Sequence, residues 1–146
     1  MFTLTLVTPE KKLVAGAEIE EVFVPGDRGE LNILPGHAPL MTTLRPGIVR
    51  YRLKGESTLH RVAVSSGYAQ VNGVGVNVLA ETAQRAEDLN AGAIDQALID
   101  AETRLAASDA TVQELEEMTH KIEVARVHKD LLNLGGTGSG SNDSSN

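Results

Sequence analysis

The sequence predicts an α+β protein, in which an N-terminal antiparallel β-sandwich of nine or ten strands precedes a C-terminal antiparallel α-helical hairpin. Residues 1–84 alternate apolar and polar side chains with period two, and they hold all five prolines. Residues 85–134 hold no proline and place apolar side chains three or four positions apart. Because the first period is typical of strands and the second of amphipathic helices, we expect residues 1–84 to form one domain and residues 85–134 another.

Four alternating runs indicate individual strands in the first domain. They span residues 2–6, 49–54, 59–64 and 74–78. Turn residues separate the strands about every 8–12 positions, a spacing that is typical of an antiparallel sandwich or barrel. Asn72-Gly73 stands between two apolar runs and predicts a hairpin with a two-residue turn.

Two helices are expected in the second domain. Between residues 88 and 106, one helical face carries Leu89, Ala93, Ile94, Ala97, Leu98, Ala101 and Leu105. Thr111 and Glu114 have the spacing of a capping box that begins a second helix, which should end near Leu134, before two glycines. Two helices of about twenty residues joined by a short loop form an antiparallel hairpin about 30 Å long.

The second helix carries two apolar stripes on roughly opposite sides. One consists of Leu115, Met118, Ile122, Ala125 and Leu132, and the other of Val124, Val127, Leu131 and Leu134. The first helix can cover one stripe, whereas the other stripe requires either the sandwich or a partner protein. A hairpin of about 45 residues is too short to be firmly stable alone, so the surface that buries the second stripe sets its position. If the hairpin moves, both surfaces serve in turn, and the hairpin is a candidate switch element.

Composition excludes several classes of protein. A net charge of −7, an aromatic content of 3% and the absence of Trp argue against a nucleic-acid partner. The absence of Cys excludes disulfides, Cys-based zinc sites and thiol catalysis. No apolar run approaches the ~18 residues that span a bilayer, and the strand pattern begins at the N-terminus. We therefore expect a soluble intracellular protein without a signal or transit peptide, and a disordered tail of small polar residues over 135–146.

No segment has the pattern of a catalytic or cofactor site. The sequence lacks a phosphate-binding P-loop, and the segment 65–68 lacks the flanking glycine of a nucleophile elbow. His120 and His128 are eight positions apart rather than four, and no carboxylate pair stands at acid–base spacing. We therefore expect no metal, no cofactor and no catalytic residue. These patterns alone leave open a generic protein-binding sandwich with a helical dimerisation arm.

The segment 29–40 is the densest in distinctive residues. Glu30 and His37 lie on either side of an apolar strand, and Pro35 and Pro39 introduce two rigid turns. Two interpretations stay open from the residues alone. The prolines fix the bend of a hairpin, or the polar pair forms an exposed edge suited to docking.

At this segment the sequence resembles the epsilon subunit of bacterial F-type ATP synthases. The resemblance covers about residues 2–134. The residues that carry it are Gly29-Glu30-Leu31 with Leu34-Pro35-Gly36-His37-Ala38-Pro39, then Leu44-Arg45-Pro46-Gly47, Ser65-Ser66-Gly67-Tyr68 and Val78-Leu79-Ala80-Glu81-Thr82-Ala83. They occur in the order and spacing of that family, whose sandwich and helical hairpin match the fold predicted above.

The resemblance implies a non-catalytic subunit of the central stalk, without catalytic residues of its own. Its partners are then the gamma subunit and the c-ring, bound through the sandwich, and it couples proton flow to ATP synthesis. The family's hairpin either folds on the sandwich or extends into the alpha/beta catalytic head, where it blocks rotation and inhibits ATP hydrolysis. Glu30 and His37 then face the c-ring. The chain is then peripheral, held by the complex at the cytoplasmic face of the bacterial inner membrane or the thylakoid equivalent.

Basic residues on the second helix fit the same interpretation. Lys121, Arg126, His128 and Lys129 cluster within about 160° of the helix circumference. They are either ordinary cations near a helix C-terminus, where they interact favourably with the helix dipole, or, as the resemblance implies, residues that attract an acidic segment of the catalytic beta subunit. Each exposed pair contributes ~0–1 kcal/mol, so several must act together. With Val124, Val127 and Leu131 they complete the partner-binding candidates.

One motif departs from the family pattern. Some relatives bind ATP on the folded hairpin through a motif of the form Ile/Leu-Asp-x-x-Arg-Ala. The matching stretch here begins at Leu89, and it has Asn90 in place of the acidic residue and Ala93 in place of the arginine. Since a cationic partner for phosphate is missing, we expect weak or absent nucleotide binding.

Overall fold

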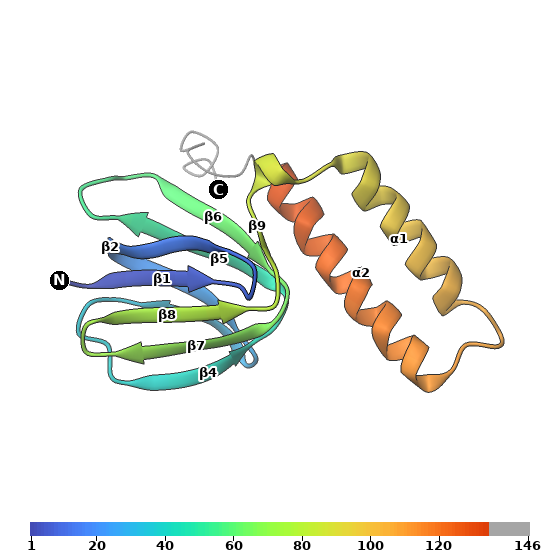
Figure 1. Cartoon of the computed structure of the whole chain (residues 1–146), viewed down its shortest axis with the longest axis horizontal. Coiled ribbons are helices and arrows are strands. Elements are labelled where there is room, and N and C mark those ends of the chain that lie inside the picture. Colours follow the sequence, from blue (N-terminus) through green and yellow to red (C-terminus); the bar gives the residue numbers. More distant parts are fainter. Residues whose placement is uncertain (135–146) are drawn as a thin grey trace.

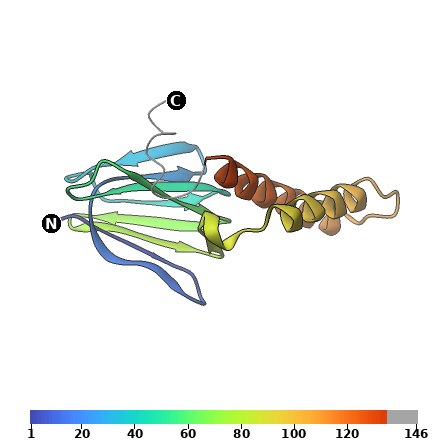
Figure 2. The ribbon, with the colours of Figure 1, turned by 90° about the horizontal axis from the view of Figure 1, so that it is seen from above.

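The computed structural model describes residues 1–134, and the tail predicted over 135–146 lies outside the described residues. Within the described part, nine strands precede a 3-10 turn and two helices. The elements are β1 (Thr3–Val7), β2 (Lys12–Gly26), β3 (Gly29–Ile33), β4 (Leu40–Leu44), β5 (Gly47–Leu53), β6 (Leu59–Val64), β7 (Gly67–Asn72), β8 (Gly75–Ala80), β9 (Ala83–Gln84), η1 (Ala86–Asp88), α1 (Ala91–Leu105) and α2 (Val112–Asn133). The strands form a sandwich, and the two helices project from the end opposite the N-terminus (Figures 1 and 2). The predicted fold class is confirmed.

The long strand β2 joins the two layers of the sandwich. The strands follow the order β1-β8-β7-β4-β2-β5-β6-β9, with β3 paired to β2. The first half of β2 pairs with β1, and its second half pairs with β3 and β5. The pairings between the strands are antiparallel except for β1 with β8, which is parallel. Sequence periodicity does not reveal this pair, because the two strands are distant in the chain.

The core between the layers is aliphatic, as the period-two alternation predicts. Leu4 and Leu6 in β1 have no exposed surface, whereas the threonines beside them are half-buried. Other side chains without exposed surface in the core are Val22, Val24, Ile33, Val49 and Val62. Burial of such side chains stabilises the sandwich by roughly 1.5–3 kcal/mol each relative to exposure.

The predicted hairpin at Asn72 is present, but its turn is displaced by one residue. Asn72 still pairs with Gly75, so the two loop residues are Gly73 and Val74. The amide oxygen of Asn72 accepts hydrogen bonds from the backbone N–H groups of Val74 at 2.9 Å and Gly75 at 3.1 Å. Asn72 therefore stabilises the turn from its first position, a common use of asparagine.

Side-chain caps begin both helices. The Asn90 side chain accepts a hydrogen bond from the backbone N–H of Ala93 at 2.9 Å and begins α1. Thr111 and Glu114 form the predicted capping box at the start of α2. The Glu114 carboxylate also receives Arg104 of α1, at 2.7 Å. Hydrogen bonds from Thr111 and Arg104 lower the pKa of Glu114 below its ordinary value.

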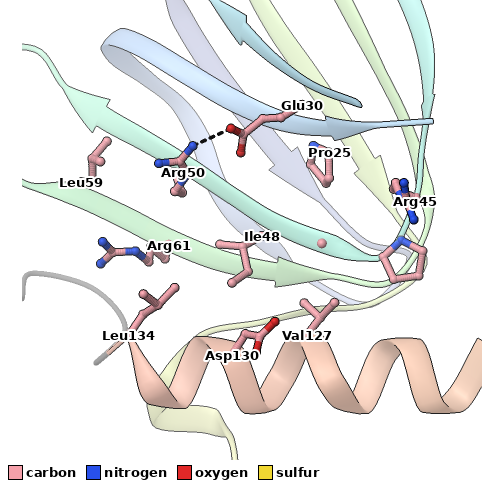
Figure 3. Close-up of a pocket in the computed structure, with 12 residues that line it drawn as sticks. Pro25, Glu30, Arg45, Ile48, Arg50, Leu59, Arg61, Val127, Asp130 and Leu134 are labelled. Atoms are coloured by element: carbon pink, nitrogen blue, oxygen red, sulfur yellow. Dashed lines mark hydrogen bonds and ion pairs between the residues drawn. The ribbon is translucent and has the colours of Figure 1, made fainter. Parts of the chain in front are cut away.

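The C-terminal half of α2 packs on the outer face of β5 and β6. Leu131 has no exposed surface there, and Ala63 of β6 is almost completely covered. Val127 and Leu134 face Ile48 of β5 (Figure 3). The rest of α2 diverges from the sandwich together with α1 (Figure 1). In this structure, therefore, the sandwich covers the second apolar stripe.

Replacing Leu131 by alanine should loosen the hairpin without unfolding the sandwich. Loss of a fully buried leucine side chain costs about 2–5 kcal/mol, which here falls on the contact of α2 with β5 and β6. Hydrogen exchange of the full chain should show faster exchange of amides over 121–134 and unchanged exchange in β7 and β8. Val112→Ala is the matched control, because Val112 is 73% exposed on the diverging half of α2. Unchanged protection of α2 in Leu131→Ala would contradict the described packing.

Candidate partner-binding site

The candidate residues occupy three separate places in the structure. Glu30 lies at the start of β3, and His37 lies in the loop between β3 and β4. The remaining seven are on α2, namely Lys121, Val124, Arg126, Val127, His128, Lys129 and Leu131. The candidates therefore lie at one end of the sandwich, at its opposite end, and on one helix.

Glu30 belongs to the end of the sandwich nearest the hairpin. It pairs with Pro25 of β2 beside the turn that joins β2 to β3. Its Oε1 atom accepts a hydrogen bond from the Arg50 guanidinium at 2.7 Å (Figure 3), and 48% of the Glu30 side chain is exposed. Arg50 in turn lies over the ring of Phe23, 4.2 Å from its centroid, a cation–π contact that positions the guanidinium. The Glu30 charge is thus held in a fixed place at the rim of the sandwich.

His37 belongs to the opposite end. It is half-buried in the loop over residues 34–39, where its backbone N–H donates to the Leu34 carbonyl at 3.0 Å. The neighbouring Pro35 and Gly36 line a shallow hollow together with Met1. Because β3 separates His37 from Glu30, and a strand rises about 3.3 Å per residue, the structure does not bring the two side chains together.

Two of the basic residues on α2 face the first helix. Arg126 forms an ion pair with Glu102 at 3.6 Å, and Lys129 forms one with Asp95 at 3.3 Å. All four side chains are more than half exposed. These acidic partners are not among the residues predicted from the sequence. Asp95 and Glu102 are seven positions apart and so share one face of α1, a spacing that indicates a row of charges opposite the basic pair.

The other two basic residues on α2 face the sandwich. Lys121 is exposed and His128 is half-buried, and both line a cleft of about 560 Å³ between the hairpin and the β8–β9 turn. Burial lowers the pKa of His128 below its ordinary value of 6.5. The four basic residues therefore divide into two pairs that point in different directions, and they do not form a single patch.

The apolar candidates on α2 lie against the sandwich. Leu131 is fully buried, and Val124 and Val127 are half-buried. Val124 lines the 560 Å³ cleft on one side of the helix, and Val127 lines a second cleft on the other side. A partner protein can reach Leu131 only if α2 leaves the sandwich.

The second cleft has a volume of about 620 Å³ and is rich in arginine. Arg45, Arg50 and Arg61 line it from the sandwich, and Asp130 lines it from α2 (Figure 3). Arg61 is only 3% exposed, and its burial and the nearby Arg50 charge lower its pKa. The cleft places positive charges of the sandwich beside the end of the hairpin.

The residues that depart from the nucleotide motif lie in the 560 Å³ cleft. The Asn90 amide oxygen is occupied by the N-terminal cap of α1, and Ala93 contributes only a methyl group. The charged side chains that line this cleft are Glu81, Asp88 and Lys121, so carboxylates outnumber fixed cations. Such a cleft does not favour a polyphosphate.

The described residues form neither a metal site nor a membrane-spanning helix. Between residues 1 and 134, no group of three or more His, Asp or Glu side chains is arranged to hold a metal ion. None of the helices in that range is long and apolar enough to cross a membrane.

The fold defines a class of β-sandwich proteins that carry a C-terminal helical hairpin. Residues 1–86 match the ATP synthase, delta/epsilon chain, beta-sandwich domain family. The ATP synthase epsilon chain of Bdellovibrio bacteriovorus is 46% identical over 102 residues, which are 70% of this chain and 73% of that one. The epsilon chain of Parvibaculum lavamentivorans is 39% identical over 122 residues, 82% of this chain and 91% of that one. The chain belongs to the ATP synthase epsilon chain family.

Solved structures show the same fold. One chain of the Euglena gracilis mitochondrial ATP synthase, in an OSCP/F1/c-ring structure, superposes with a TM-score of 0.79 at 20% identity. That match covers 90% of this chain and 81% of the other. A chain of the Tetrahymena thermophila mitochondrial ATP synthase central stalk and c-ring superposes with a TM-score of 0.63 at 12% identity, over 90% and 96% of the two chains. At these identities the likeness concerns the fold.

Isothermal titration calorimetry of the full chain with ATP should show no tight binding. The physical reason is the cleft itself, which lacks a cation from α1 and carries two carboxylates. The double variant Asn90→Asp/Ala93→Arg restores both motif residues and should bind ATP more tightly than the natural sequence. Tight binding by the natural sequence would show that other residues replace the missing arginine.

Proposed function

We propose that this epsilon-family chain is a non-catalytic subunit of the central stalk of the F-type ATP synthase. In this proposal residues 1–84 attach to the rotor and couple its rotation to ATP synthesis, and residues 85–134 regulate the enzyme by inhibiting ATP hydrolysis. Membership of the family supports the first part. The proposed regulation rests on one observation, namely that α2 packs on the sandwich only along its C-terminal half (Figure 1).

We propose the gamma subunit and the c-ring as partners of the sandwich. Large side chains on its outer surface support a docking role, since Met41 of β4 is 63% exposed and Tyr68 of β7 is 43% exposed. Glu30 and His37 stay candidates for contact with the c-ring. Because they lie at opposite ends of β3, they would contact different parts of a partner.

The hairpin is proposed to exchange the sandwich for the alpha/beta catalytic head. Arg126 and Lys129 are paired with α1 only through exposed ion pairs, each worth ~0–1 kcal/mol. Exchanging these carboxylates for an acidic segment of the head therefore costs little. The apolar stripe around Leu131 is the stronger contact, and its release decides whether the extended state forms.

Attachment to the complex gives the proposed location. The chain is peripheral at the cytoplasmic face of the bacterial inner membrane, or at the equivalent thylakoid face, and reaches the membrane only through its partners. We propose no nucleic-acid partner for the chain.

Deleting residues 85–146 should raise the ATP hydrolysis rate of the assembled complex and leave assembly intact. The reason is that the deletion removes the hairpin and retains the rotor-binding sandwich. Hydrolysis is measured on purified complexes with equal subunit content. A full-length Lys121→Gln/Arg126→Gln/Lys129→Gln variant separates charge from bulk, because it keeps the hairpin and removes its proposed attraction to the head. Unchanged hydrolysis in the deletion would remove the inhibitory role and leave the coupling role in place.

Affinity purification of the tagged chain from native membranes should recover the gamma subunit and the c-ring. Mass spectrometry of the recovered proteins is the measurement, and membranes that contain the untagged chain, treated in the same way, are the control for non-specific recovery. Recovery of neither rotor component would favour a generic protein-binding sandwich with a dimerising hairpin.

A further inference from the structure

His128 occupies the contact between the hairpin and the sandwich. It lies on α2 three positions before the fully buried Leu131, and its ring is half-buried. The ring lines the 560 Å³ cleft, whose opposite wall is formed by Ser65, Thr82 and Gln84 of the sandwich. Movement of α2 away from the sandwich therefore exposes the ring to water.

No compensating group accompanies this imidazole. Among residues 1–134, His128 has no hydrogen-bond or ion-pair partner. The charged and titratable side chains that share its cleft are Glu81 of the β8–β9 turn, Asp88 of η1, and His120 and Lys121 of α2 itself. The part of α1 that lines the cleft contributes no charged side chain. The two carboxylates form no ion pair with His128, and burial of the ring is the cause of its lowered pKa.

We propose that His128 makes the attachment of the hairpin to the sandwich dependent on pH: the neutral imidazole keeps α2 docked, and protonation releases it. The proposal rests on the proposed function, since it names a signal that regulates the same hairpin. A positive charge in a half-buried place without a partner is unfavourable, and release of α2 hydrates it. The buried Leu131 opposes release at every pH, so protonation of the imidazole changes the equilibrium between docked and released hairpin without determining it alone.

The sign follows from the direction of the shift. Burial lowers the pKa of the docked His128 below 6.5, whereas the released side chain returns to that ordinary value. The contribution of His128 to docking is therefore complete above pH 6.5 and is lost as pH falls through the lower pKa of the docked state. Within this window the docking constant falls by at most about tenfold per pH unit, because a single proton is involved.

The test uses the full chain, which contains no cysteine and so accepts two spin labels at chosen positions. Asn77→Cys places one label on the exposed face of β8, and Glu117→Cys places the other on the exposed part of α2. Double electron–electron resonance between pH 8 and pH 5 measures the fraction of released hairpin. The natural residue should give a fraction that rises below pH 6.5, and His128→Asn should give a fraction independent of pH.

Further variants show whether the pH response comes from His128. His120→Asn removes the other histidine of the cleft and should leave the pH response unchanged. If His128→Asn is already released at pH 8, His128→Leu decides, because its apolar side chain restores burial without a titrating group. A released fraction that does not vary with pH in the natural chain, or a response that persists in both His128 variants, would overturn the proposal. These distances are measured without the ATP synthase, so failure here is separate from the outcome of the hydrolysis assay on the deletion.

Discussion

The contact of Leu131 with the outer face of β5 and β6 determines the position of the entire hairpin. A pair of short helices has a small core of its own, here built from Ile94, Ala101, Ile122 and Ala125. Those side chains hold α1 to α2, but they do not specify where the pair lies. The second apolar stripe of α2 does so, because it loses its contact with water only when a second surface covers it. The sandwich provides that surface in this structure.

The interactions of the hairpin fall into a clear order of strength. Burial of Leu131 is worth a few kcal/mol, whereas the exposed pairs of Arg126 and Lys129 with α1 are worth at most about 1 kcal/mol each. The apolar contact therefore sets whether α2 is docked, and the charges matter only for the choice of a second surface in the extended state that we propose. The apolar side chains shared by α1 and α2 keep the two helices together during such a movement, and the Arg104–Glu114 ion pair near the loop adds a small contribution. Release of the hairpin as a unit consequently requires only the sandwich contact to break.

Features that depend on neighbouring residues could be predicted from the sequence, and features that depend on distant ones could not. The capping box at Thr111 and the change from a strand period to a helix period are local patterns, and the structure contains that capping box and strands followed by helices. The parallel pairing of β1 with β8 and the Arg50–Glu30 ion pair join segments far apart in the chain. The turn at Asn72 could be predicted in part, because its presence follows from the sequence and its one-residue displacement does not. An Asn-Gly pair indicates a turn, but the hydrogen bonds of the side chain decide which residues form its loop.

The cleft beside α2 shows how a small change of residues alters the use of one place in a fold. Asn90 begins α1 through its amide oxygen, and this role needs no charge. With Ala93 one turn later, the wall formed by α1 is neutral, and the charged side chains that line the cleft are Glu81, Asp88 and Lys121. An added anion meets an excess of carboxylates there, whereas a proton on His128 meets no partner at bonding distance. The charges of this cleft therefore oppose a bound phosphate, whereas the proposed response to protonation depends on the burial of the His128 ring, which α2 loses when it leaves the sandwich.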